Sequence, residues 1–270
     1  MLTESVPAAE ATTETSAPPL TADDILCTAL DVGEGLLKNG ATVHRTEDTV
    51  ERICRAFGAV HVEVFCIPSL ILAAVRMEDG AYSSQNRRIH ASANHFYRLD
   101  RFNTVSRRLC SGEITIAQAQ EEMQAIKRSD AYPTWMQYLG SLLGSGAFSL
   151  FFGGSLLDAI SVALIGCLIA GIKQFLPRNV NPLSSTVVCA FTAGALSMLL
   201  TWAGLANNYD KVMIGTIMLL IPGMSFGTSL RDMLGGDIMA GMLQFLAAIL
   251  LAAIIAFGYV IAIFLFQPLL

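Results

Sequence analysis

The pattern of hydrophobic and polar positions divides the chain into two parts of different character. Up to residue 132, apolar residues recur at the spacings of amphipathic helices and strands, with charged residues between them. From residue 133 to residue 270, apolar residues run almost without interruption, and only eight charged residues occur. This division predicts a polar domain at 21–132 followed by a membrane domain at 133–270.

The amphipathic segments of the first part predict an α+β domain large enough to bury its own core. Thr21 begins a helix as a weak capping-box variant with Asp24, and Asn39-Gly40 ends it. The other predicted elements are a helix at 46–57, strands at 60–66, 69–76 and 81–84, and helices at 92–109 and 114–126. Residues 1–20 are rich in Thr, Ala and Pro, so we expect a disordered lead-in that is not a cleavable signal peptide.

The apolar segments of the second part predict five transmembrane helices, because each is long enough to cross a hydrocarbon core of about 30 Å. They lie at about 135–152, 155–176, 185–205, 211–230 and 238–266. If the first two were one span, it would be about twice as long as the bilayer core requires, so a count of four spans is not favoured. Gly140 and Gly144, one turn apart, would allow a close helix contact in the first span.

Loop charges predict the orientation of these helices. Lys173 and Arg178 follow the second span, and Arg231 follows the fourth. The positive-inside rule therefore predicts that the polar domain and the N-terminus are cytoplasmic and the C-terminus is outside.

The fourth span is interrupted at Ile221-Pro222-Gly223, about 11 residues and so roughly 16 Å from its start, near the bilayer midplane. Because Pro222 lacks a backbone donor and Gly223 tolerates unusual dihedrals, we expect the helix to kink or open there. Backbone groups freed at that depth must face protein or a water-filled cavity, and broken helices often form transporter substrate sites. The alternative is a packing kink without a ligand, since both residue types are common in membrane helices.

Polar residues near the break complete the candidate substrate and coupling site. Ser225 and Thr228 could line a path, although such groups singly are more often contacts between helices. Arg231 could clamp a carboxylate or serve as a positive-inside anchor that pairs with Asp232. The full candidate set is Asp158, Pro222, Gly223, Ser225, Thr228, Arg231, Asp232 and Asp237.

Asp158 is a carboxylate well inside a predicted span. It could carry a coupling proton, because burial favours the neutral acid. It could instead pair with Lys211, which the predicted topology places at the same membrane face, or cap a helix at the interface.

Other patterns exclude several function classes. A net charge of −5 without long single-sign runs suggests no nucleic-acid partner, and a GxxxxGK[ST] loop is absent. Six cysteines form no CxxC pair, so we expect reduced thiols. None of the four histidines, His44, His61, His90 and His95, has metal-ligand spacing. We therefore expect no catalytic site, metal or cofactor.

The order of motifs resembles the threonine/serine exporter family over residues 25–265. The matching pieces are Leu36–Thr42 with Arg45 and Glu47, Phe57-Gly58, Pro68, Asn103–Leu109, Ser111–Ile114, Phe148, Phe151–Gly154, Asp158, Ile221–Gly223, Arg231-Asp232, Gly236-Asp237 and Gly241. The family pattern usually reads closer to G-A-E-T before the arginine, whereas Thr42-Val43-His44 stands here.

The resemblance implies a subunit of a proton-coupled secondary exporter in the bacterial inner membrane. Full-length members carry two five-helix sets, so one set resembles the longer subunit of the split, two-gene form, and its partner would be a small membrane protein of the same family. Threonine, serine and the C4-dicarboxylate succinate are the implied substrates. The residues alone leave two alternatives open, a membrane-anchored sensor or hydrolase acting through the cytoplasmic domain, and a channel.

Overall fold

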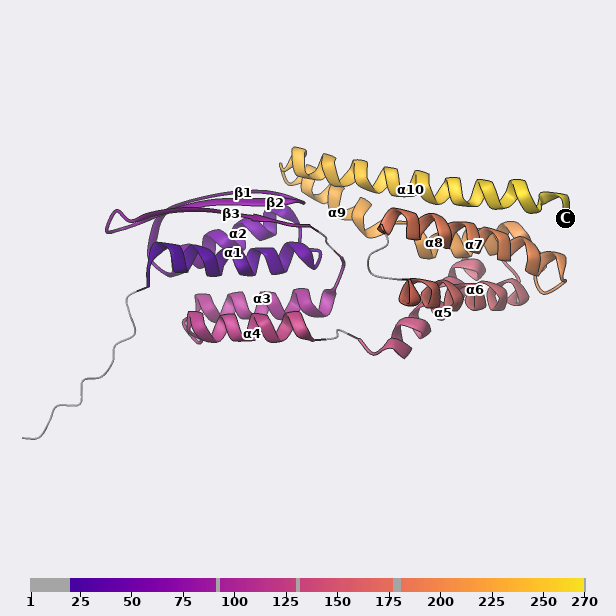
Figure 1. Ribbon diagram of the computed structural model, residues 1–270, viewed down its shortest axis with the longest axis horizontal. Helices are drawn as coiled ribbons and strands as arrows, with labels where there is room; N and C mark the ends of the chain where they lie inside the picture. Colours follow the sequence, from indigo (N-terminus) through magenta and orange to yellow (C-terminus); the bar gives the residue numbers. More distant parts are fainter. Residues whose placement is uncertain (1–19, 91–92, 130–131, 177–180, 270) are drawn as a thin grey trace, which may run out of the picture.

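The computed structural model describes residues 20–90, 93–129, 132–176 and 181–269. The predicted lead-in at 1–20 lies almost wholly outside these residues, as does Arg178. The described chain is mostly helical and forms two regions, an α+β region from α1 to α4 and a helical bundle from α5 to α10 (Figure 1).

The α+β region contains the elements that the amphipathic patterns predict. They are α1 (Ala22–Lys38), α2 (Val43–Ala56), β1 (Ala59–Ile67), β2 (Leu70–Met77), β3 (Tyr82–Arg88), α3 (Phe96–Cys110) and α4 (Ile116–Arg128). The strands pair antiparallel in the order β1-β2-β3. The sheet lies on one side of α1 and α2, and α3 and α4 lie on the other (Figure 1). β3 is longer than the predicted strand at 81–84. Its polar residues pair with β2 although they lack the alternation of apolar residues by which a strand is recognised in a sequence.

Local sequence signals explain where the helices of this region begin. Thr21 and Asp24 form the predicted capping box, in which the Asp24 amide donates to the Thr21 hydroxyl at 3.2 Å. Thr115 and Gln118 form a second one at α4. Each box satisfies backbone amides that the first helical turn leaves without partners.

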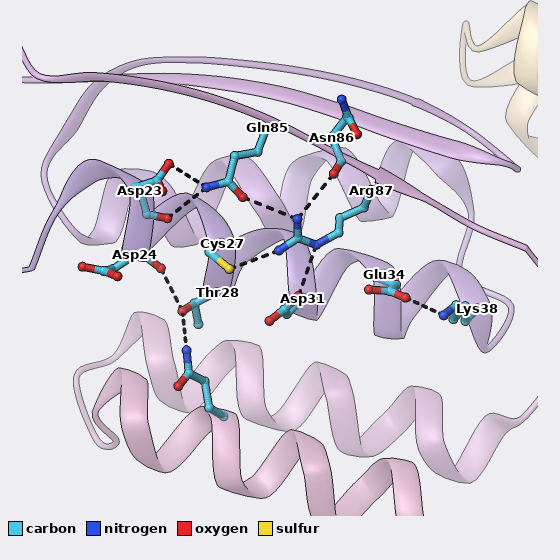
Figure 2. Close-up of polar contacts among 11 residues, drawn as sticks. Asp23, Asp24, Cys27, Thr28, Asp31, Glu34, Lys38, Gln85, Asn86 and Arg87 are labelled. Atoms are coloured by element: carbon cyan, nitrogen blue, oxygen red, sulfur yellow. Dashed lines mark hydrogen bonds and ion pairs between the residues drawn. The ribbon is translucent and has the colours of Figure 1, made fainter.

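Polar contacts fix α1 against β3 (Figure 2). Gln85 donates to the carboxylate of Asp23 at 2.7 Å, and Arg87 reaches Asp31 at 3.3 Å and the Cys27 sulfur at 3.1 Å. These bonds compensate for the low apolar content of β3. The hydrogen bond from Ser83, and to a smaller extent that from Gln85, lowers the pKa of Asp23, because both donors stabilise the ionised carboxylate.

The helical bundle extends away from the α+β region (Figure 1). Its helices are α5 (Thr134–Phe151), α6 (Leu156–Phe175), α7 (Pro182–Trp202), α8 (Tyr209–Leu220), α9 (Gly223–Leu234) and α10 (Ile238–Phe266), followed by a short 3-10 turn at Gln267–Leu269. Three of them, α6, α7 and α10, are long and apolar enough to cross a membrane, and α8 with α9 makes a fourth if the bent pair is one span. The predicted first span forms α5, which does not meet the same criterion, so five spans and the orientation of the termini remain predictions.

Small residues bring the bundle helices close together. Gly140 and Gly144 are not among them, since no atom of the described residues lies within 4 Å of a Cβ added at either position. The close contact of α5 is made instead at Gly146, whose added Cβ would lie 3.2 Å from the Ala159 carbonyl on α6. One-turn spacing of small residues does not by itself identify which face of a helix meets a neighbour.

Each of the two regions has its own hydrophobic core. One is built from α1–α4 and the sheet, and the other from α6, α7, α8 and α10. Ala240, in the first turn of α10, belongs to the core of the α+β region. The start of α10 therefore packs against that region and fixes the junction where the candidate site lies.

Candidate functional site

The predicted helix break is present at Pro222. α8 ends at Leu220, α9 begins at Gly223, and the two helices are bent by 53°. The Gly223 amide donates to the Ile221 carbonyl at 2.9 Å in a tight turn. The cause is the one expected from the sequence, since proline has no amide to continue the helical ladder.

A cavity of about 400 Å³ lies beside this break, within the range typical of small-molecule sites. One wall belongs to the bundle and the other to the α+β region. The lining residues are Leu37, Gly40, Ala41, Val43, Pro68, Ser69, Ala93, Asn94, Pro222, Ser225, Thr228, Leu243, Gln244, Ala247, Ala248 and Leu251. The structure thus places the break at the junction of the two regions, and its depth near the bilayer midplane stays a prediction.

Polar side chains of α9 and α10 meet on the bundle wall of the cavity. Gln244 donates to the Thr228 hydroxyl at 2.7 Å, and that hydroxyl donates to the Met224 carbonyl at 3.0 Å. Ser225 lies one turn before Thr228 on the same wall. This wall therefore combines hydroxyl and amide groups with the apolar residues Leu243, Ala247 and Leu251, the mixture expected for a small hydrophilic ligand.

The N-terminus of α9 opens onto the same cavity. Pro222 is its N-cap, and no described side chain caps it. The first amides of a helix lack intrahelical partners and carry partial positive charge, so they favour a carboxylate. The Gly223 amide is already bonded to the Ile221 carbonyl, so the amides of Met224 and Ser225 are the ones available to a ligand.

The opposite wall is tightly built around Gly40, the residue after the C-terminal end of α1. Its φ of +97° is a left-handed conformation that favours glycine, and an added Cβ would lie 2.5 Å from the Asn94 side-chain oxygen. The Ala93 amide donates to the Lys38 carbonyl at 2.9 Å and closes this wall behind Asn94. The motif that ends at Thr42 thus forms part of the cavity.

Asp158 lies far from this cavity, at the N-terminus of α6. Its buried carboxylate accepts from the Ser155 amide and hydroxyl at 2.9 and 2.8 Å, and from the Asn207 and Asn208 amides at 2.6 and 3.0 Å. The Asn208 side chain adds a donor at 3.2 Å. This geometry is a helix cap that also ties α6 to the turn before α8, as the interfacial-cap alternative proposed.

The proposed pairing of Asp158 with Lys211 is wrong. Lys211 instead forms an ion pair with its neighbour Asp210 at 3.5 Å. Amide donors already occupy both oxygens of Asp158, so a lysine is not needed to compensate its charge.

Arg231, Asp232 and Asp237 do not line the cavity but lie beyond it, where α9 turns into α10. The Asp237 amide donates to the Asp232 carbonyl at 3.0 Å and the Gly236 amide to the Met233 carbonyl at 3.3 Å, with Gly236 at φ +105°. This is a Schellman turn, which requires a residue that tolerates positive φ. Arg231 is exposed and forms no ion pair with the described residues.

The turn brings Asp237 to a pair of residues on α2 that sequence spacing did not connect with it. Ligand atoms of His44, Glu47 and Asp237 lie within 4.8 Å of one another. Glu47 also accepts from the Cys66 amide at 2.7 Å. Burial raises the pKa of Glu47, the Cys66 amide opposes this, and the charge of Asp237 adds to the rise. The only sign of this cluster in the sequence is that His44 and Glu47 are three residues apart, which places them on one face of a helix.

Comparisons with known proteins agree on a family of transporters. The model of the threonine/serine exporter family matches residues 28–266. Over 243 residues the chain is 23% identical to "Probable threonine/serine exporter" of Mycobacterium tuberculosis, and the match covers 88% of this chain and 46% of that protein. Over 236 residues it is 23% identical to "Probable succinate transporter subunit YjjP" of Escherichia coli, covering 87% and 91%. The chain thus spans about half of the first relative and most of the second. No solved structure gives a significant match.

Proposed function

Because the chain belongs to the threonine/serine exporter family, we propose that it is a subunit of a proton-coupled exporter whose substrate binds in the cavity at the Pro222 break. The observation that carries this proposal is the cavity itself, which joins an uncapped helix N-terminus to polar side chains of α9 and α10. Both relatives are named as transport proteins rather than enzymes. The chain is accordingly not an enzyme.

The chemistry of the cavity favours a small metabolite with a carboxylate. The free amides of α9 would receive the carboxylate, as half-helix N-termini do in other transporters. Thr228 and Gln244 offer further hydrogen bonds to a hydroxyl, an ammonium or a second carboxylate. Threonine, serine and succinate all satisfy this description; the first two appear in the name of one relative and succinate in the name of the other.

A second membrane subunit is part of the proposal. One relative is about twice as long as the matched region, and the other is named a subunit. Transporters of this kind are commonly built from repeats around a shared site, and one set of helices supplies only half of such an arrangement. We propose a small membrane protein of the same family as the partner, in an inner membrane with the α+β region on the cytoplasmic side.

The membrane arrangement of the proposal uses α5 as a fifth span. α5 packs along α6 and α8 and is about as long as a bilayer core requires. Its exposed apolar side chains, among them Leu139, Leu143 and Leu150, would face lipid or the second subunit. The positive-inside bias supports the cytoplasmic placement of the α+β region.

Proteoliposomes test the proposal directly. The chain is reconstituted alone and together with a short membrane protein of the same family, and uptake of labelled threonine, serine and succinate is measured with and without an imposed proton gradient. We expect gradient-dependent accumulation of at least one substrate with both subunits present. Absence of flux for all three would contradict the export proposal, and flux without accumulation would indicate a channel.

A further inference from the structure

We propose that His44, Glu47, Asp232 and Asp237 form a site for a divalent metal ion that links the α+β region to the turn between α9 and α10. Three of these residues already hold ligand atoms within 4.8 Å of one another. The ion would connect α2 to the far end of the broken helix pair. This inference concerns metal binding and does not depend on the proposed transport activity.

The burial of Asp232 is a second observation that supports a metal site. Its side chain is only 2% exposed, and neither carboxylate oxygen has a hydrogen-bond partner among the described residues. The amide of Val43, in the first turn of α2, lies near this carboxyl group, and so do the charged groups of Asp237 and His44. The Asp232 carboxylate therefore lies beside the cluster, close enough to Glu47 and Asp237 for their charges to interact, while the ligand atoms within 4.8 Å of one another are those of His44, Glu47 and Asp237.

Buried charges in proteins are paired or coordinate metals, because an unpaired buried carboxylate is strongly unfavourable. Three carboxylates gather here, and one oxygen of Asp237 is also buried without a partner. The nearby cation among the described residues is Arg231, whose exposed side chain forms no ion pair with them. A divalent cation would supply the missing positive charge and occupy the free oxygen lone pairs.

The backbone holds these groups in place without the ion. His44 and Glu47 lie one turn apart on α2, and Glu47 is oriented by its bond from the Cys66 amide. The Schellman turn brings Asp237 beside Asp232. Such outer contacts are typical of metal sites, where ligating carboxylates are themselves hydrogen-bonded.

The donor set indicates the class of ion. Carboxylate oxygens suit Mg²⁺, Ca²⁺ and Mn²⁺, whereas an imidazole suits transition metals and zinc. One imidazole with three carboxylates is therefore best matched by Mn²⁺ or Zn²⁺. Mn²⁺ is the practical probe because its free form is measured directly by electron paramagnetic resonance.

The experiment titrates Mn²⁺ into the full chain, purified in detergent and stripped with a chelator, while free Mn²⁺ is measured. We expect one ion per chain and an affinity at least about tenfold weaker in Glu47→Gln and in Asp237→Asn, the size of effect that altered metal shells commonly give. Asp48→Asn is the matched control, because Asp48 lies on α2, is exposed and pairs with Arg52; its affinity should equal that of the unchanged chain.

His44→Gln is a third site variant, chosen because His44 is exposed and its replacement leaves both hydrophobic cores intact, so this variant should fold. Gel filtration and the thermal unfolding midpoint of each variant without metal establish that it is folded. The unchanged chain should gain thermal stability with Mn²⁺ or Zn²⁺, and the site variants should gain less. An unchanged chain that binds no Mn²⁺ and no Zn²⁺, or variants that bind as tightly as it does, would overturn the proposal.

Discussion

The side-chain amide of Gln244 on α10 donates a hydrogen bond of 2.7 Å to the hydroxyl of Thr228 on α9, at the wall of the cavity beside Pro222. This contact joins the second half of the broken helix pair to the helix that follows it. Both residues face the space in which we place the substrate. The same two side chains therefore hold α9 against α10 and line the proposed substrate site.

Gln244→Leu should lower substrate flux about three- to tenfold, because it removes a donor from the cavity wall and leaves Thr228 without this partner, a loss of about 0.5–1.5 kcal/mol. Initial rates in proteoliposomes measure the effect. Gln174→Leu is the matched control, since Gln174 accepts an exposed hydrogen bond from Tyr138 at 2.9 Å away from the cavity. Equal loss in both variants would show that the effect is not specific to the site.

Pro222→Ala should reduce flux more strongly, because alanine restores the amide and allows α8 and α9 to straighten across the break. A straighter pair would reduce the opening onto the amides of α9. Flux assays and the thermal unfolding midpoint together separate loss of function from loss of folding, since replacing a proline between two helices should change stability by no more than about 1 kcal/mol. Pro182→Ala is the control, because Pro182 is at the first position of α7, where proline is well tolerated. Full activity of the Pro222 variant would remove the break from the mechanism.

Asp158→Asn should lower stability by about 1–3 kcal/mol, because an asparagine presents one oxygen where the carboxylate accepts from several donors. The dependence of transport on the proton gradient should survive in the protein that remains folded. Thermal unfolding in detergent and gradient-driven uptake measure the two properties. Asp210→Asn, which changes an exposed carboxylate paired with Lys211, should leave both unchanged. A stable Asp158 variant that transports without gradient dependence would restore the coupling interpretation.

Gly258→Val should destabilise the bundle by more than about 2 kcal/mol, a typical result of overpacking a close contact. A Cβ at Gly258 would lie 2.7 Å from the Ala190 Cβ on α7 and 3.1 Å from the Val187 carbonyl. The matched control is Gly140→Val, where no described atom lies within 4 Å of an added Cβ. Thermal unfolding of both variants in detergent gives the comparison. Similar midpoints would mean that α7 and α10 do not pack as closely as the structure shows.

The sequence predicted the features that depend on neighbouring residues. The capping box of Thr21 and Asp24, the three strands and the break at Pro222 all follow from short-range patterns, and the structure contains them. The resemblance to threonine/serine exporters is confirmed by the family match. These signals are local because proline, glycine and capping residues act within one turn of themselves.

Contacts between distant segments were not predictable in the same way. Nothing in the spacing of Asp158 showed that Asn207 and Asn208 would supply its donors, because those residues come from a turn 49 and 50 positions later. The meeting of Glu47 with Asp237 depends on the docking of α10 against the α+β region. Helix length likewise gave no sign that residues of the α+β region would line a cavity beside Pro222.

Protection of a cysteine placed at the break tests the central claim most directly. In a Ser225→Cys variant, co-expressed with the proposed small partner, the rate of labelling at residue 225 by a thiol reagent is followed by mass spectrometry of the corresponding peptide. The account predicts that saturating threonine, serine or succinate slows this labelling several-fold, while a cysteine introduced at Ser185, on α7 and outside the cavity lining, reacts at an unchanged rate. Labelling at residue 225 that none of the transported substrates slows would contradict a substrate site at the Pro222 break.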